Sequence, residues 1–177
     1  MLKVLIADDE EKICQLIIKL INWEEMGLKI AATASNGIEA LEQAKICKPE
    51  ILITDIRMPG IDGMELIRKV KEKLPDTEII IISGYRHFEY AQTAIRYGVR
   101  NYLLKPIKKE ELRDTLQKIA DIYREKNEQL NFEERVRLAL KNDAGKLRTS
   151  FISRMIYGDR ERENIISLKE LNNQYHF

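Results

Sequence analysis

Five short aliphatic runs alternate with amphipathic stretches along the first part of the chain, and this alternation is the strongest constraint on the fold. The runs are Lys3–Ala7, Ile30–Ala34, Ile51–Thr54, Glu78–Ile82 and Asn101–Leu104. Between them, apolar residues recur three and four positions apart, as they do on one face of an α-helix. Continuous apolar strands are usually covered on both faces, as in parallel sheets. The pattern therefore predicts a doubly wound α/β domain over residues 1–122.

A longer helical pattern begins at Lys109. Its residues step by four and three, in the order Leu112, Leu116, Ile119, Tyr123, Lys126 and Leu130. Two interpretations remain open: a coiled-coil seam, or a single helix that packs on the sheet and continues as a solvated extension. The sequence NDAG (142–145) predicts a break, followed by short helices over Lys146–Tyr157 and Arg160–Tyr175. Residues 123–177 are thus expected to be a helical linker without a core of their own.

Net charge, hydropathy and cysteine spacing give no sign of a nucleic-acid partner, a membrane span or a metal-binding cysteine pair. The formal net charge is +1, so global charge does not indicate a nucleic-acid or membrane partner. No apolar run approaches the roughly 20 residues that cross a bilayer. Cys14 and Cys47 lie in helical patterns without C-x-x-C spacing. We interpret them as core residues of a protein in a reducing cytoplasm.

Polar residues directly follow four of the five aliphatic runs. They are Asp8, Asp9, Asp55, Ser83 and Lys105. Ligands of doubly wound sheets bind outside the carboxyl ends of the strands, so these groups are expected to converge. Three neighbouring carboxylates repel one another unless a cation neutralises them. Oxygen ligands without Cys or His favour a hard ion, and this predicts Mg²⁺.

This set of groups is suited to phosphoryl transfer. A carboxylate beside Mg²⁺ can attack phosphorus and form an acyl phosphate. The Lys105 ammonium can pair with a phosphoryl oxygen, and the Ser83 hydroxyl can donate to another. Each residue also has an ordinary alternative, such as a helix cap for Asp8 or a solvated surface position for Lys105. Their occurrence at successive strand ends favours one shared site.

The chain resembles the receiver domain of two-component response regulators. The matching segments are LIADDEE (5–11), NGIEAL (36–41), ILITDIRMPGIDGMELI (51–67), IIISG (80–84) and YLLKP (102–106). Their order and spacing both agree with that family. The resemblance implies a flavodoxin-like sheet of five parallel strands in the order 2-1-3-4-5, followed by a C-terminal helical extension. It also implies a cytoplasmic protein that switches a signal on phosphorylation.

The resemblance assigns roles to the acidic residues. Asp55 is the expected phosphoacceptor and a sensor histidine kinase the expected donor. Asp9, Asp55 and the backbone carbonyl of Arg57 are expected to bind Mg²⁺, with Asp8 acting mainly through water. The chain is thus expected to be no enzyme beyond its own phosphorylation and dephosphorylation at Asp55.

The resemblance also predicts a switch. Lys105 is the expected phosphate-pairing lysine, joined to Pro106 by a cis peptide bond. Ser83 and Tyr102 are the expected switch pair, although Tyr102 alone would be an ordinary half-buried aromatic residue. Phosphorylation is expected to reshape the face made by the fourth helix, fifth strand and fifth helix. A homodimer is expected through this face or through the helix 109–140.

A finer resemblance concerns the output. Asn22, Trp23, Gly27 and the segment 83–106 resemble regulators whose output is an AraC-type helix-turn-helix domain. Residues 126–177 show no convincing recognition helix. DNA is therefore expected to be bound only through a C-terminal domain that this chain lacks. Arg57 and Tyr85 flank the acceptor and are expected to influence phosphate lifetime.

Two other functions are alternatives to the switch. One is an aspartate-nucleophile phosphatase of the haloacid dehalogenase type, which needs a second acid two residues after the nucleophile. Arg57 occupies that position and counts against it. The other is an unphosphorylated adaptor with a receiver-like fold, which the complete acid set disfavours.

Overall fold

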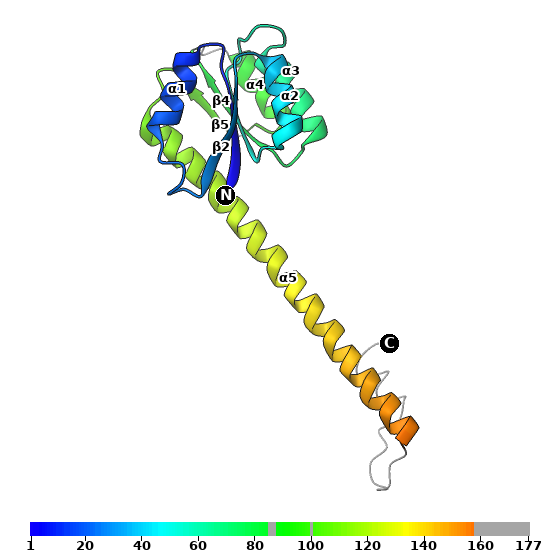
Figure 1. Cartoon of the computed structure of the whole chain (residues 1–177). Helices are drawn as coiled ribbons and strands as arrows, with labels where there is room; N and C mark the ends of the chain where they lie inside the picture. The colour runs from blue at the N-terminus through cyan, green and yellow to red at the C-terminus, as the bar shows by residue number, and fades with distance from the viewer. Residues whose placement is uncertain (85–87, 100, 158–177) are drawn as a thin grey trace. The chain divides into compact units, whose positions relative to one another are not determined.

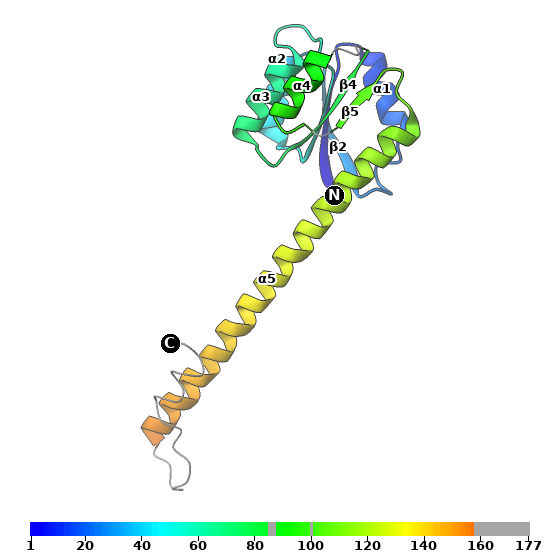
Figure 2. The same ribbon diagram turned by 180° about the vertical axis from the view of Figure 1, so that it is seen from behind.

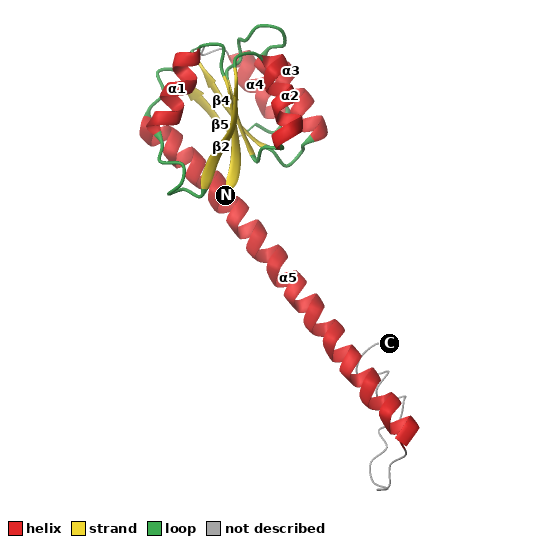
Figure 3. Ribbon diagram, in the orientation of Figure 1, coloured by secondary structure: helices red, strands yellow, loops and turns green. Residues whose placement is uncertain are grey.

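The computed structural model describes residues 1–84, 88–99 and 101–157. Strands and helices alternate along the chain, as Figure 3 shows. The strands are β1 (Leu2–Ala7), β2 (Leu28–Ala34), β3 (Ile51–Thr54), β4 (Glu78–Ser83) and β5 (Asn101–Leu104). The helices are α1 (Glu11–Leu20), α2 (Gly37–Cys47), α3 (Gly63–Lys73), α4 (Phe88–Arg96) and α5 (Lys109–Tyr157).

The five strands form one parallel sheet in the order β2-β1-β3-β4-β5. Helices α1 and the first part of α5 cover one face, and α2, α3 and α4 cover the other (Figures 1 and 2). The predicted doubly wound fold and strand order are confirmed. Because every strand runs in the same direction, all five carboxyl ends meet at one edge of the sheet.

Each face of the sheet has its own hydrophobic core. Side chains of β3 alternate between the cores: Ile51 and Ile53 pack with α1 and α5, whereas Leu52 packs with α2 and α3. Successive strand residues point to opposite faces, so a strand covered on both sides needs apolar residues at every position. This is why β3 reads as a continuous aliphatic run.

Helices α2 and α3 begin at defined caps near the carboxyl edge. Asn36 Oδ1 accepts a hydrogen bond of 2.9 Å from Glu39 N, and a Glu39 carboxylate oxygen accepts one of 2.8 Å from Ser35 N. Asp62 Oδ1 accepts one of 2.8 Å from Glu65 N. Such caps satisfy backbone N–H groups that have no partner within the helix. They fix where the first turns of α2 and α3 lie.

Helix α5 packs on the sheet at its start. Leu112, Leu116 and Ile119 are buried in the core shared with α1, and Tyr123 packs against it. The first four positions of the predicted seam are therefore packed against the sheet. The structure supports the interpretation of a helix packed on the sheet for this part of α5. The chain divides into two compact units, Met1–Lys126 and Asn127–Phe177.

The predicted helix break at residues 142–145 is wrong, because α5 continues to Tyr157. One glycine inside a helix costs only about 1 kcal/mol relative to alanine. Gly145 is flanked by Ala144 and Lys146, which are good helix formers, so this cost does not end the helix. The predicted helix Arg160–Tyr175 lies outside the described residues. Within the described residues, no helix combines the length and apolar character required to cross a membrane.

Tyr123 attaches α5 to the amino-terminal end of the sheet. Its hydroxyl lies within hydrogen-bond distance of the carbonyl oxygens of Glu50, at 3.2 Å, and of Asp76. Lys126 Nζ lies 2.9 Å from Asp76 Oδ1. Burial, with the nearby charges of Glu78, Glu50 and Asp76, raises the pKa of Tyr123 to about 12.

This raised pKa predicts a loss of stability in alkali. The neutral phenol is favoured in the folded state, so its contribution is complete below pH 10 and is lost as the pH rises towards about 12. We expect the free energy of unfolding to fall more steeply over this interval in the wild type than in Tyr123→Phe. Denaturant titrations at several pH values would measure it. Equal slopes in both proteins would contradict the assignment.

Candidate functional site

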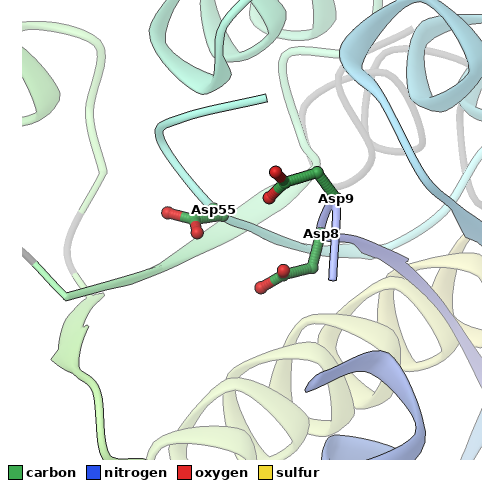
Figure 4. A group of neighbouring side chains, drawn as sticks. All are labelled: Asp8, Asp9 and Asp55. Atoms are coloured by element: carbon green, nitrogen blue, oxygen red, sulfur yellow. The ribbon is translucent and has the colours of Figure 1, made fainter. Parts of the chain in front are cut away.

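Three carboxylates lie at the carboxyl edge of the sheet. Asp8 and Asp9 follow β1 and Asp55 follows β3, and Figure 4 shows their side chains gathered there. Asp55 N donates a hydrogen bond of 2.9 Å to Ala7 O, which holds the two strand ends together. One oxygen from each carboxylate lies within 4.8 Å of the others. The structure thus brings together the acidic residues that the sequence placed at separate strand ends.

Two of the three carboxylates are buried. Asp8 is 1% exposed and Asp55 is 8% exposed, whereas Asp9 is open to solvent. Asp8 Oδ1 accepts from Glu10 N at 3.0 Å, and Asp55 Oδ1 accepts from Ile56 N at 2.5 Å. Burial raises the pKa of Asp8 above its usual range; the charge of Asp55 adds to this rise and Lys105 opposes it.

Lys105 neutralises part of this negative charge. Its Nζ lies 2.7 Å from Asp55 Oδ2, 2.9 Å from Asp8 Oδ2 and 3.7 Å from Glu10 Oε1. Burial alone would lower the pKa of Lys105, but the nearby carboxylates of Asp55 and Asp8 outweigh it and raise the pKa. The ammonium therefore stays charged. The predicted cis peptide bond between Lys105 and Pro106 is present.

The donor set fits a hard divalent cation. Asp8 Oδ2 is buried and has no hydrogen-bond partner among the described residues. Its 2.9 Å contact with Lys105 Nζ is an ion pair without hydrogen-bond geometry. Three carboxylates face a single lysine, so negative charge remains in excess. Carboxylate oxygens with spare lone pairs and excess negative charge are what Mg²⁺ requires. Asp8, Asp9 and Asp55 could hold this ion.

The predicted switch residues lie on one face of the sheet. Ser83 ends β4 and is fully buried. Tyr102 of β5 pairs with Ile81 of β4, and both side chains pack on the face covered by α4. Residues two apart in a strand point to the same face, so the Ser83 side chain belongs to this face as well. Ser83 O accepts from Lys105 N at 2.9 Å, which joins the ends of β4 and β5. The roles of Ser83 and Tyr102 stay predictions.

The remaining predicted residue is Arg57, which is exposed in the loop that follows Asp55. Tyr85 lies outside the described residues. Three residues at the site were missed by the sequence analysis: Glu10, Thr54 and Gly63. A threonine that ends an otherwise aliphatic run was the available signal for Thr54, because a buried hydroxyl needs a partner. No comparable signal marked Glu10.

Comparison with known proteins identifies the family. The family model described as the response regulator receiver domain matches residues 4–117, more than half of the chain. The transcriptional regulatory protein YesN of Bacillus subtilis (strain 168), described as uncharacterized, is 40% identical over 139 residues. This match covers 75% of the chain and 38% of YesN. The transcriptional regulatory protein HptR of Staphylococcus aureus (strain N315) is 40% identical over 107 residues, which are 60% of the chain and 42% of HptR.

Solved structures agree with this result. The receiver (REC) domain of AraT, a response regulator from Geobacillus stearothermophilus, is 41% identical with a TM-score of 0.68, covering 71% of this chain and 98% of that one. A two component transcriptional regulator AraC from Clostridium phytofermentans ISDg is 36% identical with a TM-score of 0.64, covering 68% and 94%. The chain spans less than half of the length of the curated relatives YesN and HptR. Sequence, fold and the extent of the match together show that the chain belongs to the response regulator receiver domain family.

Proposed function

We propose that this chain is a phosphorylation-controlled signalling switch. Asp55 accepts a phosphoryl group from a sensor histidine kinase, with Mg²⁺ bound, and the change controls a transcriptional output. The observation that carries the proposal is the convergence of Asp8, Asp9 and Asp55 with Lys105 at one edge of a receiver-family sheet.

The proposed reaction transfers phosphorus from nitrogen to oxygen. A carboxylate oxygen of Asp55 forms a bond to phosphorus while the bond from phosphorus to the kinase histidine breaks, and its electron pair returns to the imidazole nitrogen. Bound Mg²⁺ supplies charge neutralisation for the phosphoryl oxygens. Lys105 Nζ lies 2.7 Å from Asp55 Oδ2. After phosphorylation it can form its ion pair with a phosphoryl oxygen instead. In such reactions the protein mainly positions groups and neutralises charge.

The proposed switch follows from the new charge. A phosphoryl group brings about two negative charges and three strong acceptor oxygens. The Ser83 hydroxyl moves to donate to one of them, and Tyr102 turns into the space behind it. Support comes from the position of both side chains on one face of adjacent strands. The result is a shift between two packings of the face formed by α4, β5 and α5.

That face is also the proposed dimer interface. Strand β5 lies at the edge of the sheet, between α4 and α5. Ile95 of α4 is 71% exposed and Ile122 of α5 is 45% exposed. Pairing of two copies would bury these side chains. Dimerisation through the helix 109–140 instead would depend on residues after Tyr123, since the earlier seam positions pack within the receiver.

The proposed output is transcription. YesN and HptR are named transcriptional regulatory proteins, and each is much longer than its match to this chain. We place DNA contact in a C-terminal domain of AraC type beyond the described receiver, with residues 123–177 as the connector. Action on genes requires a cytoplasmic location.

Phosphorylation by a small donor tests the proposal directly. The protein is incubated with acetyl phosphate, with and without Mg²⁺, and its intact mass is measured. We expect a gain of one phosphoryl group that requires Mg²⁺ and is removed by hydroxylamine, as an acyl phosphate would be. Sedimentation velocity with beryllofluoride would follow the dimer. A protein that stays unmodified at every Mg²⁺ concentration would exclude the proposed function.

Asp9→Asn is expected to weaken Mg²⁺ binding by roughly tenfold or more, because it removes a ligand carboxylate. The fold should be little affected, since Asp9 is exposed. Isothermal titration calorimetry with Mg²⁺ measures the affinity. Glu25→Gln is the matched control: it removes one exposed negative charge from the loop before β2, at the opposite end of the sheet. Equal affinities of the two variants would remove Asp9 from the site.

A further inference from the structure

Thr54 carries a buried hydroxyl that the chemistry described above does not use. It ends β3 after three aliphatic residues, is 1% exposed, and lies between Ala7 of β1 and Ile81 of β4. A hydroxyl in such surroundings costs free energy unless it makes a hydrogen bond. Thr54 Oγ1 donates to the carbonyl oxygen of Asp55 at 2.8 Å. The hydroxyl is thus bonded to the backbone of the proposed acceptor.

That carbonyl belongs to a peptide group with a second connection to the acceptor. The same planar unit contains the N–H of Ile56, because the Asp55 carbonyl and the Ile56 nitrogen share one peptide bond. Ile56 N donates to Asp55 Oδ1 at 2.5 Å. Thr54 therefore bonds to the carbonyl oxygen of a rigid peptide group, and the N–H of the same group bonds to the Asp55 carboxylate. With Oδ1 fixed in this way, Oδ2 faces Lys105 Nζ at 2.7 Å.

The start of α3 closes the space beside this peptide group. A Cβ atom at Gly63 would lie 2.0 Å from the Asp55 carbonyl oxygen. Gly63 N also donates to Ile56 O at 2.7 Å. The carbonyl is thus bounded by the Thr54 hydroxyl and the backbone of Gly63, and rotation of the plane would disturb both contacts.

We propose that Thr54 is a positioning residue for phosphoryl transfer. By holding the peptide group between Asp55 and Ile56, it fixes the rotation of the Asp55 carboxylate before the phosphoryl donor arrives. The proposal rests on the proposed function, in which Asp55 is the acceptor. A positioned nucleophile reacts faster because the activation free energy no longer includes the cost of orienting it. Loss of the hydroxyl should therefore slow the chemical step without removing the site.

Thr54→Val tests this, because it replaces the hydroxyl with a methyl group of similar size. We expect the maximum rate of phosphorylation by acetyl phosphate to fall by about tenfold, which corresponds to about 1.4 kcal/mol. The acetyl phosphate concentration at half-maximum should not change, since donor binding does not involve Thr54. Thr54→Ser keeps the hydroxyl and should restore a rate close to that of the wild type. A purely structural role would lower the stability of the variants and leave the rate unchanged.

The outcomes separate this proposal from the proposed function. A wild-type rate in Thr54→Val, or an equally slow rate in Thr54→Ser, overturns the positioning role alone. A wild-type protein that gains no phosphoryl group overturns the proposed function and this proposal with it. Circular dichroism and Trp23 fluorescence establish that each variant is folded. If Thr54→Val is unfolded, Thr54→Ala replaces it in the test. This variant also lacks the hydroxyl, so the same tenfold fall in rate is expected.

Discussion

Asp55→Asn is expected to abolish phosphoryl incorporation from acetyl phosphate. The amide has nearly the shape of the carboxylate but lacks the anionic oxygen that attacks phosphorus. Removal of a nucleophile costs more than removal of a group that only assists it, so we expect a fall of more than roughly a hundredfold. Intact mass after incubation with acetyl phosphate and Mg²⁺ measures the modified fraction. The proposed dimer of the phosphorylated protein should not form in this variant.

The matched control is Asp114→Asn, which makes the same chemical change on the exposed surface of α5. Asp114 lies beside Arg113, with 3.3 Å between the charged groups, and both side chains are largely exposed. Its incorporation should equal that of the wild type. Folding of both variants can be followed through Trp23, which is buried and donates from Nε1 to Ile18 O at 2.9 Å. If Asp55→Asn takes up as much phosphate as Asp114→Asn, another residue is the acceptor.

Prediction of the fold from the sequence succeeded where the chain carried one strong pattern. Strands β3 and β5 begin and end at the predicted residues, because each run stops at a charged side chain, Asp55 or Lys105. The prediction placed the start of β2 at Ile30, because Lys29 interrupts the apolar run. The strand begins two residues earlier, at Leu28. In α5 the local signal at Gly145 was weaker than the helix propensity around it.

The sequence could predict at which edge of the sheet the side chains of the site lie, but not how they are oriented there. Residues that follow parallel strands must meet at one edge, so the approach of Asp8, Asp55 and Lys105 follows from strand order alone. Which oxygen faces which donor depends on distances of a few ångströms, and no spacing in the sequence encodes them. The hydrogen bond from Thr54 Oγ1 to the Asp55 carbonyl and the unpaired Asp8 Oδ2 are details of this kind.

The second large effect is expected from Gly63→Ala. An ideal Cβ at this position would lie 2.0 Å from Asp55 O, 2.9 Å from Asp55 C and 2.8 Å from Ile56 Cα. All three are backbone atoms, which cannot turn aside as a flexible side chain does, so either the start of α3 or the backbone of Asp55 and Ile56 must move. We expect a loss of about 3 kcal/mol in the free energy of unfolding. Denaturant titration followed by Trp23 fluorescence measures it.

Gly84→Ala separates this steric cause from a general effect of losing a glycine. Gly84 follows Ser83 at the same edge, and apart from Gly84 itself and its two chain neighbours no described atom lies within 4 Å of its ideal Cβ. Its unfolding free energy should stay within about 0.5 kcal/mol of the wild type. Gly63→Ala should also phosphorylate more slowly at temperatures where it is folded, because the displaced backbone carries the Asp55 carboxylate. Equal stabilities of the two variants would show that α3 tolerates a side chain against the backbone of Asp55, and would remove Gly63 from the contacts that hold Asp55 in place.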